Sequence, residues 1–185
     1  MDRIALQLLD QSAYDSVTNM MKARKSMMED WTMLPILITA TLGFVVAMLD
    51  FVFLQNLRFQ AFALLGLFLL VAGGYMRMKA RLQLKEKAGF KTLAETARLQ
   101  TMEGHRLVKD GLYKYIRHPL YLAETIRNFG FVMIFSSIYG ILLIAVATIF
   151  IAFRIRMEER MLIQAFGDEY REYQKNTKRI IPYVY

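Results

Sequence analysis

The side chains best suited to chemistry gather in one short stretch, residues 104–121. It holds both histidines of the protein, His105 and His118, together with three tyrosines, two glycines and one of only three prolines. These groups can hydrogen-bond, stack and fix a backbone. Because a long apolar segment follows directly, the stretch predicts a binding site at a membrane surface.

A second polar group follows that apolar segment. Arg154 and Glu158 stand four residues apart, so on a helix they share one face. An arginine can fork onto a carboxylate and orient it, and a carboxylate is already ionised at neutral pH. Glu158 suits a ligand's ammonium or ribose hydroxyl. On spacing alone, the two residues could equally form a surface ion pair.

Pro119 fixes the backbone after His118 and is expected to begin a helix. The first N–H groups of that helix would be free to receive an anionic carboxylate.

Several chemistries are excluded. The chain has no cysteine, which rules out disulfides, thiolate nucleophiles and cysteine-based metal sites. Two histidines thirteen positions apart, without a His-Glu-x-x-His pattern, predict no metal site. The net charge of +8 could suggest nucleic acid. However, the basic residues lie in blocks beside apolar segments, which favours membrane lipids as partners and no nucleic acid.

The composition predicts an all-α integral membrane protein. Hydrophobic residues make up 56% of the 185 residues and the mean hydropathy is positive, whereas apolar residues make up roughly half of a soluble domain. Two spans are expected within residues 31–76, with Asp50 at the interface near the far end of the first. Three glycines of the second span, Gly66, Gly73 and Gly74, would let a neighbouring helix approach closely.

The apolar run over residues 120–153 is too long for one ordinary span. Ser136 and Ser137 lie near its middle, so a helical hairpin is predicted, which gives about four spans. The second hairpin helix should continue beyond the membrane to Gly167, with Asp168 capping a last short helix.

Basic blocks flank these spans on one side only, so the positive-inside rule makes the protein multi-pass with both termini and the catalytic region cytoplasmic. An amphipathic helix on the headgroups is predicted for the N-terminus, with a flexible polar leader as the alternative. The expected segments are the N-terminal residues 1–30, the first two spans 31–76, a cytosolic connector 77–121, the hairpin 122–153 and a cytosolic C-terminal part 154–185.

Residues 104–182 hold a series of short motifs, made by Gly111, Tyr113, Arg117, His118, Pro119, Tyr121, Arg154, Glu158, Glu159, Leu162, Phe166, Gly167, Glu169, Tyr170, Tyr173, Arg179 and Pro182. In this order and spacing, the motifs resemble the isoprenylcysteine carboxyl methyltransferase family, which also takes in phospholipid N-methyltransferases.

The resemblance implies S-adenosylmethionine as cofactor, bound at the cytosolic end of the last two helices, and a lipophilic or prenylated acceptor from the bilayer. It implies Arg154 as the residue that binds the acceptor and acts in catalysis. The positions that match the family's cofactor contacts are His105, Arg106, Leu107, Val108, Tyr113, His118, Pro119, Leu120, Tyr121 and Glu158.

Three function classes remain open. The first is methyl transfer to a prenylcysteine-like carboxylate or to a lipid amine, which would first have to lose a proton. The second is an NADPH-dependent sterol-type reductase, which shares the Arg-His-Pro-x-Tyr element and an acid at Glu124. The third is a non-catalytic scaffold, which would leave the clustered polar residues unexplained. Tyr170 and Tyr173 are expected to pack, and Glu124, Arg127 and Asn128 either line an acceptor entrance or snorkel.

Overall fold

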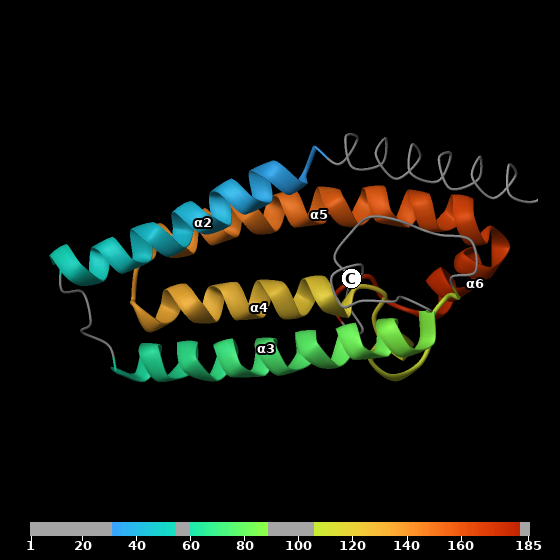
Figure 1. Cartoon of the computed structure of the whole chain (residues 1–185), viewed down its shortest axis with the longest axis horizontal. Helices are drawn as coiled ribbons and strands as arrows, with labels where there is room; N and C mark the ends of the chain where they lie inside the picture. The colour runs from blue at the N-terminus through green and yellow to red at the C-terminus, as the bar shows by residue number, and fades with distance from the viewer. Residues whose placement is uncertain (1–30, 55–59, 89–105, 182–185) are drawn as a thin grey trace, which may run out of the picture.

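The computed structural model describes residues 31–54, 60–88 and 106–181, and in these ranges the chain is helical (Figure 1). An isolated bridge between Ile116 and Lys178 is the one strand-like pairing there. The elements are α2 (Met33–Leu49), the π-helix η1 (Asp50–Leu54), α3 (Gln60–Ala88), the short 3-10 helix η3 (Gly111–Lys114), α4 (Pro119–Ile134), α5 (Ile138–Phe166) and α6 (Asp168–Asn176). The predicted all-α class is confirmed over this part of the chain.

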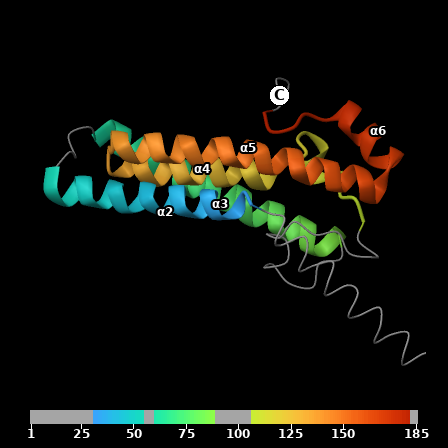
Figure 2. The ribbon, with the colours of Figure 1, turned by 90° about the horizontal axis from the view of Figure 1, so that it is seen from above.

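The long helices form two packed pairs. Helix α2 lies along α5, and α3 lies along α4 (Figures 1 and 2). Helix α4 joins the pairs, since it also contacts α5 and α2. Helix α6 turns back at the end where α5 finishes.

Within the described ranges, three helices are long and apolar enough to cross a bilayer: Met33–Phe53, Ala61–Ala88 and Ile138–Phe166. Large apolar side chains such as Phe68 and Leu142 are exposed on these helices. Such exposure is expected of a membrane protein where its surface faces lipid. Helix α4 has 16 residues, fewer than the roughly 20 of an ordinary span. Four spans and the cytoplasmic placement of the termini therefore stay predictions.

The predicted hairpin is present, as α4 and α5 joined at Phe135–Ser137. Pro119 begins α4 as expected. Ser137 caps α5 by accepting a hydrogen bond from the Gly140 backbone nitrogen at 3.0 Å. Its hydroxyl also donates to Asp50, which is buried between α2 and the hairpin instead of facing an interface with water.

Small residues bring α3 and α4 into close contact. A Cβ on Gly73 would lie 2.6 Å from the Arg127 backbone nitrogen, and one on Gly66 would lie 2.7 Å from that of Ile134. The prediction of a close approach is correct for these two glycines. It is wrong for Gly74, where a built Cβ meets no described residue within 4 Å, because the neighbouring position on a helix points to a different face.

Helices α3 and α5 both continue beyond their apolar parts, α3 as far as Ala88. Gly167 ends α5 as predicted, with a φ of 55° that favours glycine. The expected cap at Asp168 is wrong: Gly167 occupies the capping position, and Asp168 is the first residue of α6. The predicted amphipathic segment 1–30 lies outside the described residues.

Candidate functional site

A cavity of about 290 Å³ lies at the end of the bundle where α2 and α4 begin and α3 and α5 end. Of the sequence-predicted site residues, His105 lies outside the described ranges. All the others line this one cavity: Arg106, Leu107, Val108, Tyr113, His118, Pro119, Leu120, Tyr121, Arg154 and Glu158. Their proximity is thus a property of the structure, while their individual roles stay predictions.

His118 lies between two carboxylates of α5. Its Nε2 is 3.3 Å from Oε1 of Glu159, and its Nδ1 is 3.8 Å from Oε2 of Glu158. The imidazole is buried. A neutral imidazole that donates from Nε2 to Glu159 keeps a lone pair on Nδ1, on the side of Glu158.

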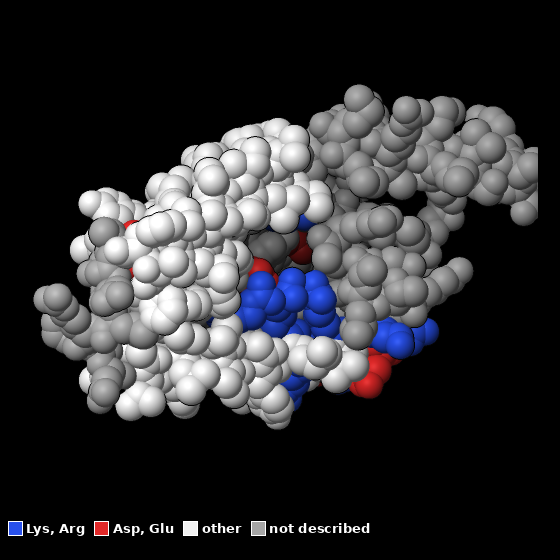
Figure 3. All heavy atoms as spheres, turned by 60° about the vertical axis from the view of Figure 1, so that its left-hand side comes forward, with Lys and Arg blue, Asp and Glu red and all other residues white. Residues whose placement is uncertain are grey.

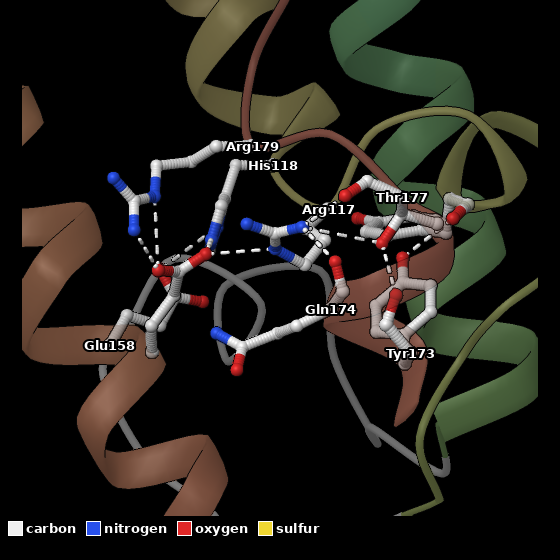
Figure 4. A network of polar contacts seen from close by, with 9 residues as sticks. Arg117, His118, Glu158, Tyr173, Gln174, Thr177 and Arg179 are labelled. Atoms are coloured by element: carbon white, nitrogen blue, oxygen red, sulfur yellow. Dashed lines mark hydrogen bonds and ion pairs between the residues drawn. The ribbon is translucent and has the colours of Figure 1, made fainter. Parts of the chain in front are cut away.

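Glu159 is the centre of a buried polar network that sequence reasoning missed. Arg117 donates from Nε to Oε1 at 2.9 Å, and Arg179 donates from Nη2 to Oε2 at 2.7 Å. Arg117, His118 and Arg179 all contact this carboxylate, and Figure 4 shows these three side chains pointing toward one place. The paired glutamates and the closing arginine were visible in the sequence, but nothing there indicated which glutamate faces inward.

The network fixes the C-terminal segment against the start of α4. Arg117 donates its backbone N–H to the Lys178 carbonyl at 2.8 Å, and His118 donates to that of Arg179 at 3.1 Å. The Arg117 guanidinium also donates to the Gln174 carbonyl at 3.1 Å and to the Thr177 carbonyl. His118 therefore enters the site in an orientation set by residues some 60 positions later in the chain.

Arg154 and Glu158 face the cavity from α5. The Arg154 side chain is buried and donates from Nε to the Tyr121 hydroxyl at 2.9 Å, which links α5 to the first turn of α4. Oε2 of Glu158 is buried and has no hydrogen-bond partner in the part of the chain that the structure describes. A surface ion pair, the alternative for these two residues, does not fit this burial.

Three tyrosines close the cavity near α6. Tyr173 packs as expected and donates to the Tyr113 carbonyl at 2.5 Å. Tyr170 lines the cavity, and its buried hydroxyl has no partner in the described ranges. Burial raises the pKa of Tyr170, Tyr173 and Tyr113 well above the ordinary value. All three hydroxyls therefore stay protonated at neutral pH.

Charged residues of α3 and α4 form the opposite wall. Glu124 lines the cavity and pairs with Arg77 and Arg127. Arg77 and Arg81, which sequence reasoning passed over, also line it, whereas Arg127 and Asn128 do not. Figure 3 shows basic side chains gathered beside a hollow in the molecular surface, with acidic atoms at its edge.

The fold and the site together define a helical membrane protein with a polar cavity at one end of its bundle. The sequence model of the isoprenylcysteine carboxyl methyltransferase (ICMT) family matches residues 64–164, more than half of the chain. The chain therefore belongs to this family, and the resemblance described above is confirmed.

The chain is also similar to individual methyltransferases. The protein-S-isoprenylcysteine O-methyltransferase of Schizosaccharomyces pombe is 33% identical over 133 residues, which cover 71% of this chain and 54% of that protein. Methanethiol S-methyltransferase 1 of Bradyrhizobium diazoefficiens is 42% identical over 77 residues, covering 39% of this chain and 25% of that protein.

The fold matches a solved structure of the eukaryotic intramembrane Ras methyltransferase ICMT, with a TM-score of 0.64 and 25% identity. The match covers 80% of this chain and 52% of that one. The chain thus spans about half the length, or less, of the relatives it matches.

Proposed function

We propose that this chain transfers a methyl group from S-adenosylmethionine to the carboxylate of a lipophilic, isoprenylcysteine-like acceptor. One observation carries the proposal. Arg154 and Glu158, one turn apart on α5, face a single cavity together with His118 and the other described residues matched to the family's cofactor contacts. The membrane helices around the cavity suit an acceptor that arrives from the bilayer, and we place the cavity on the cytosolic side.

The residues present fit S-adenosylmethionine. Two buried oxygens that face the cavity lack hydrogen-bond partners in the described chain: Oε2 of Glu158, an acceptor for an ammonium or a ribose hydroxyl, and the Tyr170 hydroxyl. Pro119 has no N–H and Leu122 donates to the His118 carbonyl, so in the first turn of α4 the backbone N–H groups of Leu120 and Tyr121 are the ones without an i−4 acceptor in the helix, and they could receive a carboxylate. The cavity volume of about 290 Å³ lies just below the roughly 300–1,000 Å³ of ligand sites.

When bound, the cofactor supplies an electrophilic methyl group on a sulfonium. The protein then has little proton chemistry to do and mainly holds two partners in line. Arg154 suits the acceptor carboxylate, because a guanidinium forks onto both oxygens of such a group. The Tyr121 hydroxyl holds its Nε at 2.9 Å, which limits the orientations of the arginine.

The cavity also has an apolar side for a hydrocarbon chain. Met33, Ile36 and Leu37 of α2 and Ile151 of α5 also line it. An acceptor with a prenyl tail could lie against this wall while its carboxylate reaches Arg154. This arrangement needs no base, since the carboxylate is ionised at neutral pH.

Transfer to a thiol is a second candidate. Two observations favour it: the 42% identity to a methanethiol S-methyltransferase over 77 residues, and the buried imidazole of His118. With Nε2 bound to Glu159, Nδ1 could accept the proton of a thiol. Lipid-amine transfer would use the same base, whereas membership of the methyltransferase family speaks against the sterol-type reductase.

A transfer assay with methyl-labelled S-adenosylmethionine tests the proposal. Protein in micelles is given N-acetyl-S-farnesylcysteine, its methyl ester, or methanethiol. Label in a base-labile ester of the free acid alone is the expected result. Label in methanethiol alone would favour the second candidate, and no transfer to any of the three would contradict methyl transfer to these acceptors.

A further inference from the structure

Three charged residues of α3 and α4, Arg77, Arg81 and Glu124, line the cavity and take no part in the chemistry above. Glu124 is their centre: Oε2 meets Nε of Arg77, and Oε1 meets Nη2 of Arg127. Arg127 also donates to Oδ1 of Asn128 at 3.2 Å. Each oxygen of this carboxylate therefore already has a cationic neighbour.

Arg81 is not one of the arginines that pair with Glu124. It lies one turn beyond Arg77 on α3 and lines the same cavity. Its Nε is buried and has no hydrogen-bond partner within the described ranges. A buried donor without an acceptor costs free energy, and two arginines one turn apart repel each other. An anion held between Arg77 and Arg81 would remove both penalties.

The charge balance of the cavity points the same way. Five arginines line it, against the two glutamates Glu124 and Glu158. Glu159 compensates Arg117 from outside the lining. The arginines of the cavity wall are Arg77, Arg81, Arg106, Arg117 and Arg154. The wall thus keeps an excess of positive charge that a bound anion would balance.

The position of the cluster indicates what kind of anion can reach it. Helix α3 changes from apolar to basic at Arg77. Arg127 lies deeper, because its backbone packs against Gly73. Ionisable side chains at the edge of the hydrocarbon commonly mark a functional site. An amphiphile lying in the bilayer would present its acidic head at this level.

We propose that Arg77 and Arg81 form an anion subsite for the acidic oxygen group, phosphate or carboxylate, of an amphiphile whose apolar part enters the cavity. The group can come from a bilayer phospholipid or from the methyl acceptor. If the acidic group belongs to the methyl acceptor, the inference rests on the proposed function. The subsite then gives that carboxylate a second cationic contact besides Arg154.

Binding without cofactor tests this subsite independently of turnover. In one arm, the full chain in detergent micelles is titrated with phosphatidylglycerol, with diacylglycerol as the neutral reference. In the other arm it is titrated with N-acetyl-S-farnesylcysteine, with the methyl ester as the neutral reference. The variants are Arg81→Gln, Arg81→Lys as a charge-retaining replacement, and Lys79→Gln as the matched control. Lys79 lies on α3 between the two arginines but is exposed and does not line the cavity.

The wild type should bind at least one acid about tenfold more tightly than its neutral reference, as one charge-assisted contact allows. Arg81→Gln should abolish most of this preference, whereas Arg81→Lys and Lys79→Gln should retain it. A preference in the phosphatidylglycerol arm alone assigns a lipid headgroup, and one in the farnesylcysteine arm alone assigns the acceptor. Equal binding of charged and neutral ligands, or an unchanged preference in Arg81→Gln, would overturn the subsite. Loss of methyl transfer with the preference intact would count against the proposed function only.

Discussion

Oε1 of Glu159 on α5 lies 2.9 Å from Nε of Arg117, the residue before His118. Both side chains are buried, with 6% and 9% of their surfaces exposed. Arg179 donates to the other oxygen of Glu159, so the carboxylate holds the start of α4 and the C-terminal segment to α5. The edge of the cavity that carries His118 is thus built from three separate parts of the chain.

Replacing Glu159 with glutamine should destabilise the protein strongly. The change leaves Arg117 without its carboxylate in a buried place, and breaking a buried ion pair in this way costs about 3 kcal/mol. Thermal unfolding in detergent micelles measures the effect. Glu172→Gln is the control, because Glu172 pairs with Lys175 at an exposed position of α6. Similar unfolding temperatures for the two variants would refute the central place of Glu159.

The two tyrosines of α6 should behave differently when each is changed to phenylalanine. Tyr173→Phe leaves the buried Tyr113 carbonyl without its donor and should cost about 1–2 kcal/mol of stability. Tyr170→Phe removes a hydroxyl that has no partner among the described residues, so stability should be unchanged or higher.

The same pair of variants also tests the cavity. If the Tyr170 hydroxyl contacts the cofactor, Tyr170→Phe should weaken binding of S-adenosylhomocysteine severalfold while the protein stays folded. Unfolding curves and calorimetric titrations on the same samples provide both readings. Unchanged affinity would assign Tyr170 to packing alone, as its sequence context first indicated.

Adding one methyl group at the contact between α3 and α4 should destabilise the protein. Gly73→Ala places a Cβ 2.6 Å from the Arg127 backbone nitrogen. The change should lower the free energy of unfolding by about 1–3 kcal/mol. Gly74→Ala should be tolerated, since a Cβ there meets none of the described residues within 4 Å. The folded yield and unfolding temperature of each variant decide the matter. Equal loss in both would indicate a helix-wide effect instead of a packing contact.

Arg154 should be needed for turnover and dispensable for cofactor binding. Arg154→Ala removes the proposed acceptor contact, so methyl transfer should fall to background while S-adenosylhomocysteine still binds. Arg160→Ala is the matched control, since Arg160 is exposed on the same helix and does not line the cavity. If Arg154→Ala lost cofactor binding as well as turnover, the separate roles proposed for Arg154 and Glu158 would be contradicted.

Much of the architecture followed from local features of the sequence. The serines at 136 and 137 divided the long apolar run into a hairpin, Pro119 started α4, and Gly167 ended α5. Each of these signals acts on its own neighbourhood: proline fixes φ, and glycine accepts a positive φ. Local chemistry of this kind can be predicted without knowing the fold.

Features that depend on long-range contacts could not be predicted in the same way. Glu158 and Glu159 are neighbours in sequence and differ only in the direction in which α5 presents them. Which one meets Arg117 and Arg179 depends on how α4 and the C-terminal segment pack. Arg81 is one of many basic residues in the sequence, and its place in the cavity wall depends on how the helices pack.

The central claim is that Glu158 and His118 border a site for S-adenosylmethionine, and calorimetry in micelles tests it most directly. S-adenosylhomocysteine should bind the wild type, NADPH should not, and Glu158→Gln should weaken the first interaction by about tenfold, the loss expected for one contact to a charged group. Binding of NADPH in place of S-adenosylhomocysteine, or equal affinity in wild type and Glu158→Gln, would contradict the account.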